Sequence, residues 1–333
     1  MVETLKILFV IIGTIIGAGF ASGKEIYLFF AKYGVNGIIG IILSSISIGL
    51  IIYKVLKISI KHNINTYEQL VKKIYKKDKV KEILKIIINI FLLISFYVMI
   101  AGFAAFFSQE LGINNILATC VICILCYITF LGNIKTIVKV NSLLMPIIII
   151  FIIYLIINNI DGFNNIEFTN KEIVKAIIKS ILFTSYNSII LIPILLSLKT
   201  YIKSIKQIKN ISILTSIIIF IVSISIYGLL LKIDINIPQI ELPIVYIAGK
   251  MGVIHKYIYG LIILGAIYTS AISAGYGILE NYAKNKKIYK LIALIMCSSA
   301  LIVSQIGFSQ LVDLLYPILG VLGFLQIFKI ILK

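Results

Sequence analysis

The sequence predicts an all-α polytopic membrane protein with about ten transmembrane helices in a single domain, residues 1–333. Two observations lead to this prediction. First, 60% of the residues are hydrophobic and only 13% are charged, whereas soluble domains are about half apolar and a quarter charged. Second, apolar runs close to the ~20 residues that cross a bilayer follow one another along the chain, with short loops between them. A soluble multidomain protein is therefore disfavoured.

Hydropathy gives the expected spans in order. They cover residues 6–30, 35–57, 83–108, 115–132, 140–158, 174–198, 210–232, 253–281, 288–305 and 309–331. The longest loop in the first half, 58–82, carries apolar residues at helical spacing between Tyr67 and Tyr75, among many lysines. We expect either an interfacial amphipathic helix on anionic lipid or a solvated charged loop there.

The charges predict the orientation. The net charge is +18, and every basic residue apart from the two histidines is a lysine. The lysines gather in alternate loops between apolar runs, where basic residues orient a membrane protein, so nucleic acid is not an expected partner. An N-terminus on the inside places most of them on one side. We therefore expect a multi-pass protein of the cytoplasmic membrane with both termini cytoplasmic.

The first span is predicted to be broken. It holds four glycines between Gly13 and Gly23, and each costs a helix about 1 kcal/mol relative to alanine. Close helix packing is one explanation, because the glycines form two small-xxx-small pairs. Two overlapping pairs together with Thr14 and Ser22 favour an unwound stretch instead.

The sixth span has a matching feature. Polar side chains occupy Phe183–Ser188 in mid-span, and Pro193 follows. An interhelical hydrogen-bond cluster would explain them, but the first and sixth spans each begin a five-helix half. Interrupted spans at matching positions of two halves are typical of a transporter binding site. The halves, 6–158 and 174–331, would then be repeats of opposite topology.

Several motifs resemble the bacterial YkvI-type membrane protein family. They are Gly17–Gly23 followed by Glu25, the Ser185-Tyr186-Asn187 segment, and Tyr316-Pro317 with Gly320 and Gly323. More broadly, the pattern is similar to the LeuT fold of the amino acid–polyamine–organocation transporter superfamily. This resemblance implies a five-plus-five inverted repeat with broken helices 1 and 6, and a substrate held between these helices and helices 3 and 8.

The resemblance also implies a sodium site between helices 1 and 8. By this analogy Gly13, Ile16 and Ala266 provide carbonyls, and Thr269 and Ser270 provide hydroxyls. A hard cation prefers oxygen ligands, and an unwound turn leaves carbonyls without donors. The alternative is that the two hydroxyls bond to carbonyls one turn earlier in their own helix. No cofactor is expected beyond Na⁺ as the coupling ion.

The expected solute is a small zwitterion resembling an amino acid. The half-helix that begins after the break offers free N–H groups and a dipole that favour a carboxylate. No arginine is present to hold a second carboxylate. The predicted substrate-binding residues are Gly17, Ala18, Gly19, Phe20, Ala21, Tyr97, Ser185, Tyr186 and Asn187.

Three charged residues near the spans are candidates for gating or coupling. Lys24 and Asp313 are expected either to form an outer gate or to snorkel to the interface, and Glu25 is the candidate for proton coupling. We therefore expect a secondary active transporter, a sodium symporter that works by alternating access. The alternatives are a proton-coupled transporter and a non-transporting sensor like a germinant-receptor subunit. An enzyme is disfavoured because no span carries a catalytic cluster, and the oligomeric state is left open.

Overall fold

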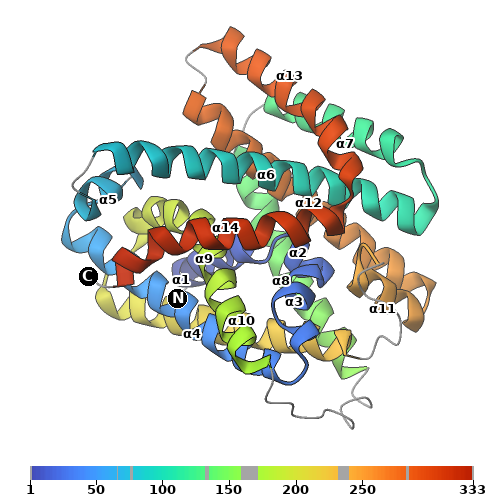
Figure 1. The fold of residues 1–333 in the computed structure, drawn as a ribbon, viewed down its shortest axis with the longest axis horizontal. Coiled ribbons are helices and arrows are strands. Elements are labelled where there is room, and N and C mark those ends of the chain that lie inside the picture. The colour runs from blue at the N-terminus through green and yellow to red at the C-terminus, as the bar shows by residue number, and fades with distance from the viewer. Residues whose placement is uncertain are drawn as a thin grey trace.

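The protein is a bundle of long helices (Figure 1). The computed structural model describes residues 2–65, 67–75, 78–131, 135–158, 172–231, 240–282 and 285–331. Within these residues the regular structure is helical throughout and includes no strand. The α-helices are α1 (Val2–Ile15), α2 (Ala18–Ser22), α3 (Lys24–Phe29), α4 (Asn36–Lys61), α5 (Tyr67–Ile74), α6 (Asp78–Leu111), α7 (Asn115–Phe130), α8 (Lys135–Ile157), α9 (Ile173–Leu198), α10 (Ile205–Leu230), α11 (Pro243–Met251), α12 (Val253–Tyr282), α13 (Lys286–Val303) and α14 (Phe308–Ile331).

Helices occupy all ten segments in which spans were expected. Seven helices of the described residues are long and apolar enough to cross a membrane, while α7 and the last part of α8 are shorter apolar helices. The first span is divided among α1, α2 and α3. The all-α membrane fold is thus confirmed, while the number of ten crossings stays a prediction.

The loop 58–82 contains a helix, α5, rather than only a charged loop. Its apolar residues Leu70, Val71 and Ile74 are buried, because α5 packs against α6 and α9. Its lysines Lys72 and Lys73 are exposed. This two-sided character agrees with the amphipathic alternative, and the packing adds a contact with the bundle that the sequence did not indicate.

The predicted break in the first span is confirmed. Gly17, with φ −85° and ψ −170°, is extended and precedes α2, and Gly23, with φ +89°, is left-handed and separates α2 from α3. The Gly17 N–H, which would bond to the Gly13 carbonyl in a continuous helix, donates to the Ile15 carbonyl at 3.0 Å instead. The Gly13 carbonyl has therefore lost its usual intrahelical donor.

The predicted break in the sixth span is wrong. The helix α9 is continuous from Ile173 to Leu198. Both serine hydroxyls of the polar segment bond back along the helix, Ser185 Oγ to the Ile181 carbonyl at 2.6 Å and Ser188 Oγ to the Thr184 carbonyl at 2.6 Å, while the Thr184 hydroxyl is buried without a partner among the described residues. Side chains that satisfy themselves in this way need no unwound backbone. Pro193 lies inside the helix and only removes one N–H donor.

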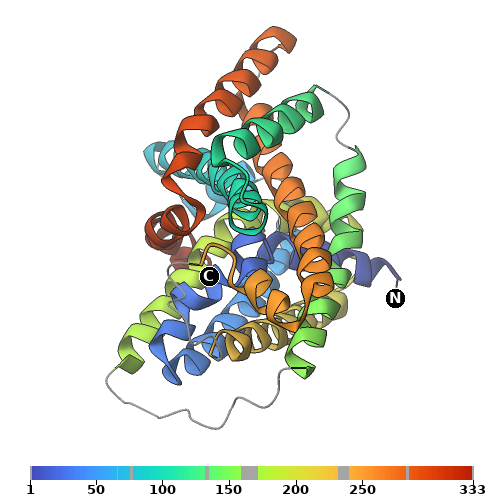
Figure 2. The same cartoon turned by 90° about the vertical axis from the view of Figure 1, so that its right-hand side faces the viewer.

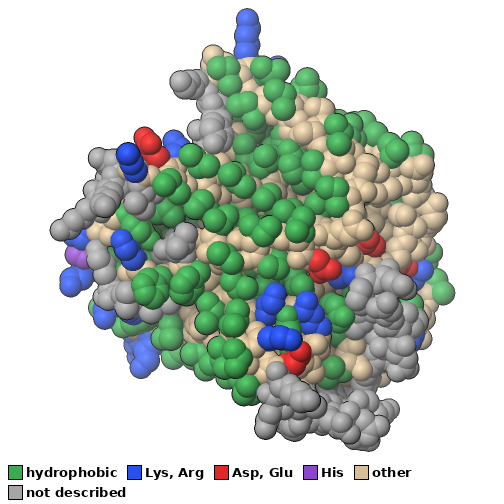
Figure 3. Space-filling view, viewed as in Figure 1, with side chains coloured by type: hydrophobic (Ala, Val, Ile, Leu, Met, Phe, Trp, Pro, Cys, Tyr) green, Lys and Arg blue, Asp and Glu red, His purple; other side chains and the backbone are tan. Residues whose placement is uncertain are grey.

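The outer surface is apolar. Helices α7 and α13 lie together at one edge of the bundle (Figures 1 and 2). Their outward side chains include Leu117, Ile128 and Ile302, which are 60% exposed or more. Hydrophobic side chains are also spread over the face in Figure 3, where basic side chains lie at the left edge, beside α5, and in a second group below the centre. Such a surface is stable only against lipid, so this is a multi-pass membrane protein.

Candidate functional site

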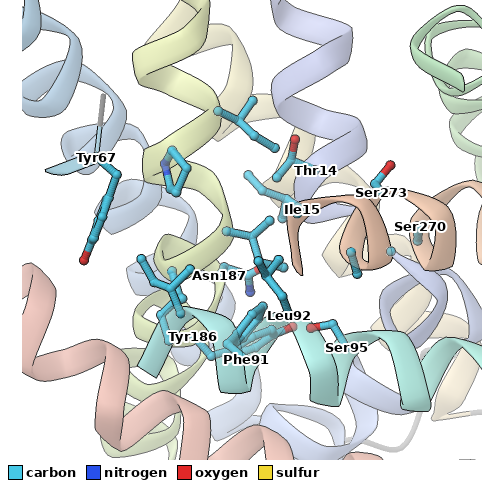
Figure 4. Close-up of a pocket in the computed structure, with 18 of the residues that line it drawn as sticks. Thr14, Ile15, Tyr67, Phe91, Leu92, Ser95, Tyr186, Asn187, Ser270 and Ser273 are labelled. Atoms are coloured by element: carbon cyan, nitrogen blue, oxygen red, sulfur yellow. The ribbon is translucent and has the colours of Figure 1, made fainter. Parts of the chain in front are cut away.

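A large cavity opens between α1, α6, α9, α12 and α14 (Figure 4). Its volume is about 1170 Å³. At one end its walls include Glu82, Lys85 and Ser197, which are exposed. At the other end they include Glu25 and Tyr316, which are buried. We call the end lined by the exposed residues the mouth, and the end lined by the buried Glu25 and Tyr316 the closed end.

Glu25 is bonded to neutral donors at the closed end. The Tyr186 hydroxyl donates to the Glu25 carboxylate, and the Phe20 backbone N–H donates to it as well. Tyr186 stacks on Phe29 with ring centroids 5.5 Å apart, and Tyr316 lies 5.0 Å from the Tyr186 ring centroid. A carboxylate on α3 is thus connected to an aromatic wall that α9 and α14 supply.

This arrangement changes the role expected for the start of α2. The sequence predicts that N–H groups of this short helix bind the carboxylate of the solute, but the Phe20 N–H is already bonded to Glu25. Gly17 lines the cavity, whereas Ala18, Phe20 and Ala21 are buried away from it. Gly19 allows the contact because a β-carbon there would lie 2.9 Å from Glu25 Cγ.

The polar segment of α9 presents two of its three predicted residues to the cavity. Tyr186 and Asn187 line it, and Asn187 Nδ2 donates to the Phe183 carbonyl at 2.9 Å, which leaves the amide oxygen free for a ligand. Ser185 does not line the cavity. It packs against α14, where a β-carbon on Gly323 would lie 2.6 Å from the Ser185 carbonyl carbon.

Tyr97 does not cap the cavity. Its hydroxyl bonds to Ser299 Oγ of α13 at 2.7 Å, so this side chain joins α6 to α13. Ser95 lines the cavity instead. Residues two apart on a helix point in directions about 200° apart, so the choice between Ser95 and Tyr97 depends on which face of α6 meets the broken helix.

The sodium site expected from Gly13, Ile16, Ala266, Thr269 and Ser270 stays a prediction. Gly13 and Ser270 line the cavity, and Ile16 is fully buried. The Thr269 hydroxyl donates to the Gly265 carbonyl at 3.0 Å and to the Ala266 carbonyl at 3.1 Å. Thr269 thus follows the back-bonded alternative, in which its hydroxyl hydrogen is used within α12 while its oxygen lone pairs stay available to a cation.

The end opposite the mouth is closed around Lys24. Its side chain is 1% exposed and interacts electrostatically with Glu241 and Asp313. Glu241 accepts from the backbone N–H and the hydroxyl of Ser309, both at 2.7 Å. Asp313 is exposed. The expected Lys24–Asp313 gate thus includes a third charged residue, and its opening and closing stay a prediction.

Comparisons with known proteins agree with this description. No family model matches the chain. It is 27% identical over 327 residues to the uncharacterized membrane protein YkvI of Bacillus subtilis (strain 168), covering 95% of this chain and 91% of YkvI. It is 26% identical to YyaD of the same organism, covering 96% of this chain and 93% of YyaD. These two homologues confirm the resemblance to the YkvI-type family.

Solved structures decide the fold. A Na⁺-coupled sialic acid symporter in a substrate-bound, outward-open state matches with a TM-score of 0.61 and 14% identity, covering 96% of this chain and 76% of that one. An inward-facing conformation of Mhp1 matches with a TM-score of 0.53 and 12% identity, covering 96% and 73%. The chain has the LeuT fold. The LeuT-type arrangement places the cavity beside the broken helix, as described above.

Proposed function

We propose that the protein is a secondary transporter that carries a small amino-acid-like solute across the membrane by alternating access. The observation that carries the proposal is the cavity, which begins at the discontinuous first helix and has its mouth at the other end. Binding sites of transporters lie near mid-membrane, at helix interruptions of this kind. The LeuT fold and the similarity to a sodium-coupled symporter support the same class, as opposed to an enzyme.

The conformation is inward-open in this proposal. The mouth lies at the first turns of α6, around Glu82 and Lys85, and at the last turns of α9, around Ser197. The lysine-rich segments 54–85 and 199–209 adjoin these helix ends. Cytoplasmic loops carry the excess of lysine, so the mouth faces the cytoplasm. Lys24 closes the opposite end, where α6 finishes and α9 begins.

Sodium is the proposed coupling ion. Its ligands would be the carbonyls of Gly13, Ile16 and Ala266 and the hydroxyls of Thr269 and Ser270. The Gly13 carbonyl has lost its helical donor, and Ser270 lines the same cavity. With carbonyls from α1 on one side and oxygens from α12 on the other, the cation would have oxygens on both sides. One charge moving inward provides about 2.3 kcal/mol per 100 mV.

A binding screen followed by an uptake assay tests this function. The purified protein is heated with each amino acid in NaCl and in KCl, because a bound ligand raises the Tm. Any solute that raises the Tm is then offered to proteoliposomes under an inward sodium gradient. We expect accumulation that depends on the gradient. Binding without accumulation, in vesicles whose reconstituted protein still binds the solute, would contradict the transporter proposal and favour a sensor.

A further inference from the structure

Glu25 is unusual among the charged side chains that line the cavity. In the described part of the chain, Glu82 and Lys85 are exposed at the mouth, whereas Glu25 lies at the closed end and is 3% exposed. A buried carboxylate is costly unless a cation or a proton compensates its charge. The closed end of the cavity thus holds a buried acidic group.

The groups around Glu25 supply no compensating charge. From α9 the Tyr186 hydroxyl donates to it, and from α14 the neutral Tyr316 interacts with it electrostatically. The tyrosine of α10, Tyr227, donates to the Gly34 carbonyl instead. The adjacent Lys24 interacts with Glu241 and Asp313. No salt bridge to Glu25 is present among the described residues, so the missing positive charge has to arrive through the cavity.

The walls near Glu25 suit an organic cation. Phe91, Tyr186 and Tyr316 line the cavity, and aromatic faces attract ammonium groups, most strongly where water is excluded. The same surroundings disfavour a carboxylate on the solute. The Phe20 N–H is taken by Glu25, and like charges close together in a buried site repel each other. The closed end thus favours an ammonium group and disfavours a carboxylate.

We propose, building on the transport function above, that Glu25 binds the ammonium group of the solute in exchange for a proton, and that among amino-acid-like solutes the preferred ones are small amines that lack the carboxylate. In the empty cavity Glu25 carries the proton on a carboxyl oxygen. When an alkylammonium ion enters, the O–H bond breaks, the electron pair stays on the carboxylate, and the proton leaves to water in the cavity. The carboxylate and the ammonium ion then form an ion pair.

Three probes that share one branched alkyl group separate the possible ligand chemistries. They are 3-methylbutylamine, with an ammonium group only, leucine, with both charges, and 4-methylpentanoate, with a carboxylate only. Binding is measured by thermal shift on the purified full-length protein, and proton release by a pH indicator in weak buffer. We expect 3-methylbutylamine to bind most tightly, with up to one proton released per molecule bound. Because binding releases a proton, its affinity should fall about tenfold for each unit by which the pH is lowered, over the range in which Glu25 is protonated in the empty cavity.

The variant Glu25→Gln tests the residue itself. The amide keeps the shape and still accepts from the Tyr186 hydroxyl, but it carries no charge, so we expect 3-methylbutylamine affinity to fall at least tenfold and proton release to vanish. The matched control, Glu172→Gln, removes a carboxylate that pairs with Lys175 on the surface, and it should bind like the unmodified protein.

Four outcomes would overturn the inference. They are no Tm shift with 3-methylbutylamine, tighter binding of leucine or 4-methylpentanoate than of 3-methylbutylamine, binding without proton release, and equal binding by folded Glu25→Gln. The transport function has a separate readout. If Glu25→Gln takes up a solute as fast as the unmodified protein, the role of Glu25 is refuted and the transport function stands. If binding depends on Glu25 but no uptake occurs, the role of Glu25 stands and the transport function is refuted.

Discussion

Replacing Gly19 by alanine tests how tightly the broken helix is fitted around Glu25. A β-carbon at position 19 would lie 2.9 Å from Glu25 Cγ and closer still to one carboxylate oxygen. Glu25 cannot yield easily, because Tyr186 and the Phe20 N–H both hold its carboxylate. The new methyl group must therefore displace the carboxylate and weaken these hydrogen bonds.

The expected cost follows from three contributions. Overpacking a buried site costs about 1–3 kcal/mol, and leaving a buried hydrogen-bond donor without its acceptor costs about 1–3 kcal/mol. Alanine returns up to about 1 kcal/mol through its better helix propensity. The free energy of unfolding should therefore fall by about 2–4 kcal/mol. At about 2–4 °C per kcal/mol, the Tm falls by at least about 4 °C.

The control for this variant is Gly17→Ala, two residues away. A β-carbon at position 17 meets only Met99 Cε, at 3.9 Å, and the backbone there has φ −85°, so alanine fits without strain. We expect a Tm within about 2 °C of the unmodified protein when both variants are heated in the same detergent. Equal Tm values for the two variants would refute the proposed fit of Glu25 against Gly19.

Three further predictions concern α12, α14 and α6. The double change Thr269→Ala and Ser270→Ala should abolish sodium-dependent stabilisation by the solute and leave the Tm in KCl within about 2 °C; unchanged sodium dependence contradicts the ion site. Gly323→Ala places a β-carbon 2.6 Å from the Ser185 carbonyl carbon. Because backbone atoms move less easily than side chains, the free energy of unfolding should fall by about 1–3 kcal/mol. An unchanged free energy of unfolding would contradict the close α9–α14 packing. Tyr97→Phe should lower the free energy of unfolding by about 1 kcal/mol, while the Tm shifts that the solute causes should persist. Loss of those Tm shifts would show that Tyr97 contributes to solute binding.

The break in the first span was predictable because glycine acts on the backbone directly. Gly17 and Gly23 adopt an extended and a left-handed conformation at the two ends of α2, and their spacing is visible in the sequence. The polar residues of α9 led to the wrong prediction of a break, because a hydroxyl in mid-span can bond either to its own helix or to an unwound turn. Ser185 and Ser188 bond to their own helix, and sequence alone does not distinguish this from an unwound turn.

The site was predictable to the level of helices and less so to the level of side chains. Tyr186 and Asn187 reach the cavity, but Tyr97 turns to α13, because the face of α6 that meets the first helix depends on the packing of the whole bundle. Glu25 was recognised as a coupling candidate. Its return contact with the Phe20 N–H was not, because that contact requires the kink at Gly23 that folds α3 back on α2.

The burial of Lys24 offers a way to follow the proposed alternating-access cycle. In the present state this side chain is 1% exposed, while the nearby Asp313 already faces water. A conformer that admits solute from that side must hydrate the lysine as it separates from Glu241 and Asp313. A cysteine can be placed at position 24 in a variant that lacks the native cysteines. It would then react with a water-soluble maleimide only when the end around residue 24 is open. The labelling rate would therefore measure how often that end opens.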